Sequence, residues 1–145
     1  MLLSFSGRTQ SWYDCNLSSI LNESFMIERE EARSLVGQGW TDVVDCLYDT
    51  VFLIDGATGS KINVTKVESY RGFFHFECED VPERYRPILN RIFQSLRATS
   101  AKTCEICGEK GLRRKYFIWV PTLCRKHFID TANRADEWKR WKESQ

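Results

Sequence analysis

"TCEICGEKGLRRKYFIWVPTLCRKH", residues 103–127, contains two pairs of candidate metal ligands. Two residues separate Cys104 from Cys107, sixteen residues follow, and Cys124 and His127 repeat the first spacing. A C-x-x-C turn directs two sulfurs toward one point, and two such pairs supply the four ligands of a tetrahedral site. Thiolate and imidazole ligands suit zinc better than calcium or magnesium. We therefore expect one zinc ion bound by Cys104, Cys107, Cys124 and His127.

The ligand set indicates a structural role for this zinc. A catalytic zinc usually has three protein ligands and keeps its fourth position for water, whereas four protein ligands are available here. His75 is the only other histidine of the chain, and it falls in a predicted strand. We expect the metal to supply folding free energy to a segment too small to fold alone. A zinc hydrolase is accordingly the least favoured function.

Hydrophobic periodicity upstream of the ligands predicts an α+β fold, with helices packed on a small antiparallel sheet. Apolar residues at helical spacing indicate a helix near 26–36, ended by the glycines of "GQG", and a second helix from Thr41 onward. The run "VFLID" at 51–55 is also compatible with a strand, because periodicity does not separate the two for short apolar runs. Composition then predicts a turn at 55–61.

Residues 61–80 alternate in the manner of a β-hairpin, with "SYRG" as its turn and Gly72 available for a positive φ. We expect Phe74 and Phe76 to face the core.

The clearest helical pattern follows the hairpin, from Tyr85 to Leu96. Asp80 and Glu83 resemble a capping box, and Pro87 is expected to mark the start of the regular helix because it cannot donate a backbone hydrogen bond. The segment "ATSAKT" at 98–103 is expected to be a short linker.

These patterns divide the chain into an α+β core at 1–100 and a C-terminal unit at 101–145. In the second unit, "LRRKYFIWVPT" can form two short strands around a turn, and the second ligand pair lies where a helix is expected to begin. A C-x-x-C turn, a hairpin and ligands in the first turn of a helix together describe a treble-clef-like zinc finger. We expect this finger and its helix to pack on the core.

Charge is unevenly distributed between the two units. Residues 1–100 carry 10 Lys/Arg and 14 Asp/Glu, and residues 101–145 carry 11 and 6, so that nets of −4 and +5 sum to +1. Solvated helix faces can produce this difference alone, and three zinc-bound thiolates would also attract nearby cations. Two sets of charged residues are nevertheless candidates for partner binding: an acidic helical face, Asp42, Asp45 and Asp49, and a basic finger tip, Arg113, Arg114 and Lys115.

The pattern "TCEICGEKG…W…TLCRKH" resembles a motif of small uncharacterised proteins of bacteria and their phages. The residues that match it are Cys104, Cys107, Gly108, Trp119, Thr122, Leu123, Cys124 and His127. Members of that group also carry an upstream "GW", as at Gly39-Trp40, and a hairpin with a glycine turn, as in "ESYRGFF". Arg71 stands where the group usually has a second glycine. The resemblance implies a zinc-stabilised fold without an established enzymatic activity.

Together these observations favour a non-catalytic, protein-binding role in a bacterial cytoplasm. Small bacterial proteins of this size and mixed charge are often immunity proteins, which block a toxin, and we carry that expectation by analogy alone. The alternative is a nucleic-acid-binding accessory protein that uses the basic finger. No stretch approaches 18 apolar residues and the start lacks a signal peptide, so we expect no membrane partner. Nothing in the sequence indicates an oligomeric state.

Overall fold

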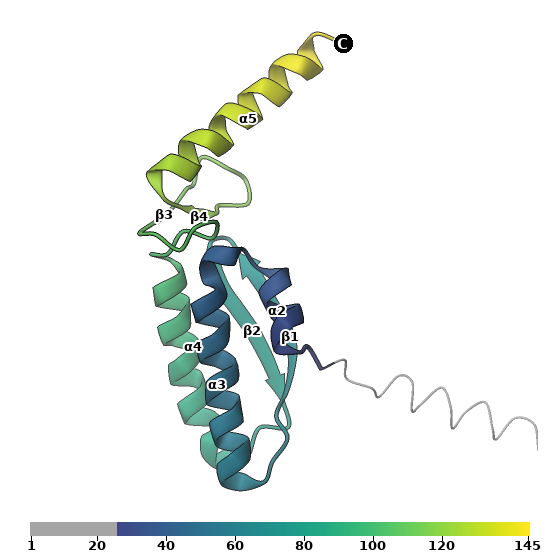
Figure 1. Ribbon diagram of the computed structural model, residues 1–145, viewed down its shortest axis with the longest axis vertical. Coiled ribbons are helices and arrows are strands. Elements are labelled where there is room, and N and C mark those ends of the chain that lie inside the picture. The colour runs from purple at the N-terminus through teal and green to yellow at the C-terminus, as the bar shows by residue number, and fades with distance from the viewer. Residues whose placement is uncertain (1–25) are drawn as a thin grey trace, which may run out of the picture.

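The computed structural model of the chain describes residues 26–145 (Figure 1). Two long helices, α3 (Thr41–Thr58) and α4 (Arg86–Ser100), lie beside an antiparallel hairpin of β1 (Asn63–Tyr70) and β2 (Phe73–Glu79), and a short helix, α2 (Arg29–Leu35), lies next to β1. Turns of 3-10 helix at Gln38–Trp40 and Glu83–Tyr85 precede α3 and α4. The C-terminal part contains β3 (Leu112–Arg113), β4 (Thr122–Leu123) and α5 (Arg125–Glu143). The predicted combination of helices with small antiparallel sheets is confirmed.

Helix α3 continues through the run at 51–55, for which the sequence left both a helix and a strand open. Residues 51–55 are helical, because Val51 and Ile54 continue the buried stripe that begins at Val43. The predicted turn at 55–61 also begins later than expected. The helix ends at Gly59, whose φ of +67° is left-handed and whose N–H bonds the Asp55 carbonyl at 2.8 Å.

A β-bulge decides which residues of β1 face the core. The strict alternation placed Lys66 on the same face as Val64, but the register shifts between these two residues, so that Val67 is buried and Lys66 is exposed. Phe74 and Phe76 of β2 are buried, as predicted. The turn at 71–72 has positive φ at both residues, +50° at Arg71 and +81° at Gly72, which is a conformation that favours glycine.

Helix α4 begins one residue before Pro87, close to the predicted start. The predicted capping box is wrong: Asp80 has a φ of +58° and its carboxylate accepts a hydrogen bond from Asn63 Nδ2 at 3.0 Å instead of capping the helix. The predicted linker at 98–103 is half helical, since α4 extends to Ser100. The buried Ser100 hydroxyl accepts the Phe74 N–H at 2.8 Å and so ties α4 to β2.

The described residues form one main core and one small C-terminal cluster. The main core lies between the helices and the hairpin, and Trp40 and Phe74 meet edge-to-face at its end next to the finger, with 6.3 Å between ring centroids. The small cluster consists of Cys104, Phe117 and Leu123, covered by Phe128, Ala132 and Ala135 of α5. Helix α5 therefore packs on the finger and then extends away from α3 and α4 (Figure 1), which differs from the expected packing on the core.

The finger is attached to the main body by close contact between backbones. The Gly39 N–H donates to the Glu105 carbonyl at 2.8 Å, and the Trp40 indole N–H donates to the Thr103 carbonyl at 2.8 Å. A Cβ at position 39 would overlap the Cys104 carbonyl oxygen and crowd the Gly108 amide. Glycine is therefore required at 39 so that the first ligand turn can reach the start of α3.

Replacement of this glycine tests the attachment. Gly39→Ala is expected to lower the free energy of unfolding by about 3 kcal/mol, because the added methyl has to displace backbone. Gly56→Ala is the matched control, since a Cβ at that helical position meets nothing within 4 Å, and it should raise stability by about 0.5–1 kcal/mol. Urea denaturation followed by circular dichroism measures both changes. Equal stability of the two variants would contradict the close contact between Gly39 and the backbone of the first ligand turn.

Candidate metal centre

The first ligand pair lies on a turn that the main body holds in place. Gly108 follows the pair with a φ of +77°, and its N–H donates to the Cys104 carbonyl at 2.9 Å. The Cys104 N–H donates to the Glu109 carbonyl at 2.7 Å, which closes the turn. This turn leaves Cys104 fully buried and Cys107 exposed at the surface of the finger.

The second ligand pair occupies the start of α5. Cys124 follows β4 directly and is the N-cap residue of the helix, so its sulfur accepts the His127 N–H at 3.5 Å. Residues Cys124 and His127 then lie on one turn, three positions apart. Pairing of Leu112 with Leu123 across β3 and β4 brings this helix start back to the first pair.

The four side chains converge as a metal site requires. All four ligand atoms lie within 4.8 Å of one another, and they form the only such group of three or more His, Cys, Asp or Glu residues in the part of the chain that is described. Cys107 and Cys124 Sγ are 3.8 Å apart, and Cys104 Sγ lies 3.5 Å from His127 Nδ1. Tetrahedral coordination at ordinary zinc bond lengths places two sulfurs about 3.8 Å apart and a sulfur and a nitrogen about 3.6 Å apart. The residues therefore fit a metal ion, and the sulfurs are too distant for a disulfide.

The surroundings of Cys104 favour its thiolate form. Burial raises the pKa of this thiol, but backbone N–H groups of Cys124, Cys107 and Ile106 and the His127 ring oppose that effect, and the net result lowers the pKa to about 7. Metal-bound cysteine is a thiolate. The backbone of the finger is thus arranged to stabilise the form of Cys104 that binds a metal.

Glu105, inside the first ligand pair, connects the finger to both neighbouring strands. Its Oε1 accepts the Ser69 hydroxyl of β1 at 3.1 Å and the Thr122 N–H of β4 at 3.1 Å. Burial raises the pKa of this carboxyl, and the two hydrogen bonds oppose the effect. Glu105 could not be identified from the sequence, because no spacing rule marks a glutamate between two ligands.

The hairpin turn is the second point of attachment. Thr122 Oγ1 donates to the Gly72 carbonyl at 2.8 Å, and Arg113 Nε donates to the Arg71 carbonyl at 2.9 Å. The two upstream features noted beside the ligand motif, Gly39-Trp40 and the glycine turn of the hairpin, are therefore both places where the finger contacts the main body.

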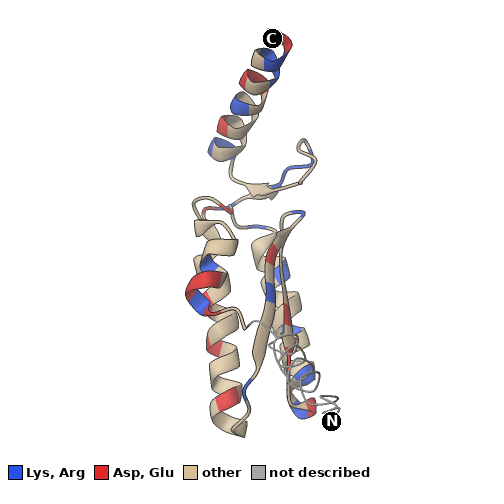
Figure 2. Ribbon diagram, turned by 90° about the vertical axis from the view of Figure 1, so that its right-hand side faces the viewer, with Lys and Arg blue, Asp and Glu red and all other residues tan. Residues whose placement is uncertain are grey.

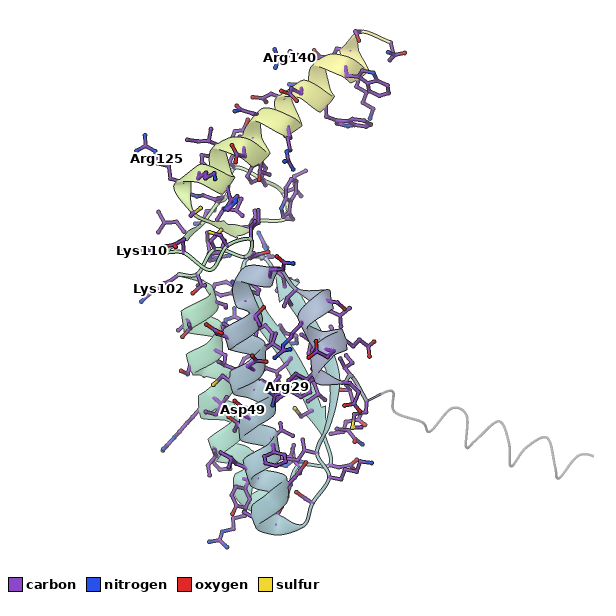
Figure 3. The ribbon with its side chains drawn as sticks, in the orientation of Figure 1. Arg29, Asp49, Lys102, Lys110, Arg125 and Arg140 are labelled. Carbon is purple, nitrogen blue, oxygen red and sulfur yellow. The ribbon has the colours of Figure 1, made fainter. Side chains whose placement is uncertain are left out.

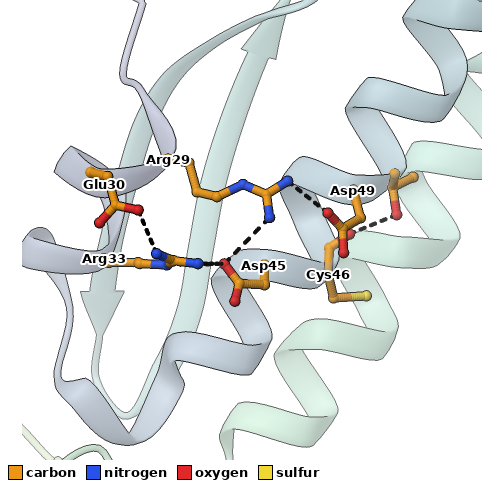
Figure 4. Close-up of polar contacts among 7 residues, drawn as sticks. Arg29, Glu30, Arg33, Asp45, Cys46 and Asp49 are labelled. Carbon is orange, nitrogen blue, oxygen red and sulfur yellow. Dashed lines mark hydrogen bonds and ion pairs between the residues drawn. The ribbon is translucent and has the colours of Figure 1, made fainter.

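The candidate acidic surface on α3 is largely engaged within the chain. Arg33 Nη2 contacts the Asp45 carboxylate at 2.6 Å, and Arg29 Nη2 contacts Asp49 at 2.6 Å (Figure 4). Both arginines come from α2, so these ion pairs hold α2 on α3. Asp42 alone of the three carries no ion pair with another described residue.

Two of the three candidate basic residues are also engaged. The Arg113 guanidinium lies 4.0 Å from the centre of the Phe73 ring, and that of Arg114 lies 4.6 Å from the centre of the Phe128 ring. Arg114 Nε also donates to the Leu123 carbonyl at 3.2 Å. Arg113 and Arg114 therefore fasten the finger to β2 and α5, whereas Lys115 remains exposed.

The one other histidine of the described chain lies apart from the ligand cluster. His75 and Glu77 have the H-x-E spacing found in zinc deaminases, but both lie on β2, where His75 Nε2 is 3.3 Å from Glu77 Oε1 and the His75 ring packs on Phe93. Neither belongs to the group of four.

The loop between β3 and β4 exposes large apolar side chains. Ile118 is 96% exposed, Tyr116 is 65% exposed, and Trp119 is 57% exposed while it stacks on the buried Phe117 with 4.7 Å between ring centroids. Exposed apolar groups of this size mark interaction surfaces when they gather in one place. The charge pattern predicted a basic tip for this segment, whereas its apolar run, "YFIWV", is what the fold exposes.

The remaining described cysteines differ in their surroundings. Cys46 is exposed on α3, whereas Cys78 on β2 is partly buried, and burial raises the pKa of its thiol from 9.0 to about 11. The protonated thiol is the form that the fold favours. The protonated Cys78 thiol therefore stabilises the folded state below pH 9.0, and this stabilisation is lost as the pH rises toward 11.

Thiol labelling checks this difference. At about pH 8, iodoacetamide is expected to modify Cys46 at least about tenfold faster than Cys78, because the thiolate is the nucleophile and Cys78 is both protonated and shielded. Peptide mass spectrometry measures each rate. In denaturant the two rates should become similar, and similar rates in the native protein would contradict the burial of Cys78.

Within residues 26–145, none of the helices combines the length and apolar character needed to cross a membrane. Comparison of the chain with protein-family models, with curated proteins and with solved structures gave no match.

Proposed function

We propose that this chain is a non-catalytic, protein-binding protein whose C-terminal unit is folded around one structural zinc ion. The exposed apolar loop between β3 and β4 carries the proposal, because it presents Tyr116, Ile118 and Trp119 on a rigid support. The partner binds this loop with its own apolar surface. Phe117 of this loop shares a small buried cluster with Cys104, which places the loop next to the candidate metal ligands.

Zinc is the metal that this ligand set suits best. Three sulfurs and one imidazole nitrogen are the donors of structural zinc sites, and harder cations prefer oxygen. When bound, the ion links the C-x-x-C turn to the first turn of α5 and supplies folding free energy. The order of a ligand turn, a short β3–β4 pair and a helix that begins at the second ligand pair supports a treble-clef-like finger.

The proposed partner is a toxin or effector protein, and the proposed setting is a bacterial cytoplasm. In this form of the proposal the chain acts as an immunity protein, which neutralises the toxin by covering part of its surface. Two features support this narrower form. The chain is small and of mixed charge. Its four candidate ligands would occupy all four positions of a tetrahedral metal ion and leave none for a substrate.

Removal of one ligand tests the structural zinc. The purified protein is expected to contain about one equivalent of zinc, and Cys124→Ser is expected to lose it together with the fold of residues 101–145. Metal analysis and hydrogen exchange measure the two effects. Cys46→Ser, which changes an exposed cysteine outside the cluster, should keep both the metal and the fold. Normal exchange protection of the finger in metal-free Cys124→Ser protein would contradict the structural role.

Replacement of exposed apolar residues tests the binding loop. Ile118→Ser with Trp119→Ser is expected to abolish recovery of a stoichiometric partner from native lysate, since hot spots of interfaces are large apolar side chains. Phe52→Ser with Leu53→Ser, at 75% and 69% exposure on α3, is the matched control and should leave recovery unchanged. Recovery that is lost in both variants, or in neither, would contradict a partner site on the loop.

A further inference from the structure

The three cysteines of the ligand cluster differ in how far solvent reaches them. Cys104 is fully buried in the small C-terminal cluster, Cys124 is partly buried, and Cys107 is exposed at the surface of the finger. Oxidation of cysteine is selective for thiolates that solvent can reach, and a metal-bound cysteine is a thiolate. Cys107 is therefore the sulfur of the cluster that a dissolved oxidant meets first.

Cys104, the other cysteine of the C-x-x-C turn, is fixed in place by its backbone and by packing. Its N–H donates to the Glu109 carbonyl at 2.7 Å, and its carbonyl accepts the Gly108 N–H at 2.9 Å. The same carbonyl oxygen packs against Gly39 so closely that no Cβ fits between them. Movement of the Cys104 sulfur toward the surface would also open the small cluster in which it is buried.

Cys124 is better placed to form a bond with Cys107. The two Sγ atoms are 3.8 Å apart, and a disulfide requires about 2.0 Å, so that the sulfurs have to approach by roughly 1.8 Å. The Cys107 side chain is exposed and turns without displacing packed neighbours. One residue belongs to the first ligand turn and the other to the start of α5. A bond between them would therefore remove one sulfur from each ligand pair.

The charges around the cluster are those of a reactive cysteine site. The C-terminal unit carries Lys and Arg on its loop and along α5 (Figure 2), and none of the cations of 101–145 forms an ion pair with a described residue. Lys110 follows Cys107 by three residues and Arg125 follows Cys124 directly, and both lie on the same side of the finger (Figure 3). Reactive cysteines occupy positively charged, solvent-accessible surroundings of this kind.

We propose that the ligand cluster is a peroxide-sensitive switch, in which Cys107 and Cys124 form a disulfide and the metal is released. The inference rests on the structural zinc of the proposed function. Once the disulfide has formed, Cys104 and His127 are the only ligands left, and two ligands do not hold an ion that requires four. The structure thus assigns an oxidant as the signal and the exposed Cys107 as the residue that receives it.

The oxidation takes two steps and consumes one molecule of hydrogen peroxide. The Cys107 sulfur attacks a peroxide oxygen, the O–O bond breaks, and the departing hydroxide takes a proton from solvent, which leaves a sulfenic acid on Cys107. The Cys124 thiolate then attacks the Cys107 sulfur, the S–S bond forms, the S–O bond breaks, and a second hydroxide leaves as water. Two thiolates are oxidised by two electrons in total, and one peroxide is reduced to two waters.

Release of the metal acts on the loop that we assign to a partner. Phe117 of that loop packs on Cys104 and Leu123, and loss of the ion removes the folding free energy that holds this small cluster together. The new disulfide still joins the first ligand turn to the start of α5, so reduction returns both thiolates to neighbouring positions. The switch is therefore reversible, and it makes partner binding depend on the level of peroxide.

Peroxide treatment of the full, zinc-loaded chain tests the proposal. A chromophoric chelator measures the released zinc, and mass spectrometry of peptides prepared without reductant identifies the disulfide. We expect about one zinc released for each Cys107–Cys124 disulfide, and recovery of the metal after reduction in the presence of zinc. Cys15→Ser with Cys46→Ser, which removes two cysteines that are not candidate ligands, should change neither result.

Two ligand exchanges separate oxidation from simple loss of the fold. Cys107→His keeps four ligands in a set that also binds zinc, and it is expected to release the ion at least about tenfold more slowly in peroxide, because the remaining sulfurs are shielded. His127→Cys is the matched control, since it also changes one ligand but keeps both Cys107 and Cys124, and it should remain sensitive. Metal content before treatment confirms that each site is loaded.

Three outcomes would overturn the switch and leave the structural zinc standing. The first is retention of zinc at a peroxide concentration that fully oxidises the exposed Cys46. The second is a disulfide between Cys104 and Cys107, which would assign the reaction to the C-x-x-C turn. The third is release from Cys107→His as fast as from the unaltered chain. A purified chain that contains no zinc would instead contradict the proposed function, so the two failures are distinguishable.

Discussion

The contact between the first ligand turn and the start of α3 is the constraint on which the rest of the structure depends. Two backbones meet there with no side chain between them, because position 39 has no Cβ. Trp40, the next residue, is fully buried in the main core and donates its indole N–H to the finger. Trp40 thus belongs both to the main core and to the attachment, so the packing of the core and the position of the finger depend on the same residue.

The candidate ligand cluster and the start of α5 share residues. The second candidate ligand pair lies at the start of α5, and Cys124 is also the N-cap of this helix. Glu105 and Thr122 connect the finger to the hairpin through hydrogen bonds. A metal ion bound at this cluster would therefore link the first ligand turn to the helix start and stabilise both. The proposed binding loop and the metal site are separate but physically linked.

Local patterns predicted most of the elements correctly, and long-range packing accounts for the errors. The hairpin, the start of α4 and the convergence of the four ligands follow from periodicity and spacing, which are properties of neighbouring residues. The bulge in β1 was not predicted, because burial of Val67 against the helices outweighs strict alternation. The packing of α5 was not predicted either, since Ala132 and Ala135 suit the finger as well as they would suit a core. Asp80 and Glu83 had the spacing of a capping box, but the chain path after β2 turned Asp80 toward Asn63.

The sequence by itself determined the ligand set and the amphipathic elements, because four ligands at fixed spacing and apolar stripes need only local geometry. Tertiary structure alone decided which charged groups remain free. Asp45 and Asp49 form ion pairs with arginines of α2, and Arg113 and Arg114 lie on aromatic rings. These residues, which belonged to the candidate acidic and basic sets, therefore make contacts that stabilise the fold. None of the cations of 101–145 forms an ion pair with a described residue, and the stacked Trp138 and Trp141 remain more than half exposed. The physical reason is that the contacts that engage Asp45, Asp49, Arg113 and Arg114 join residues distant in the sequence, and only the folded chain brings these residues together.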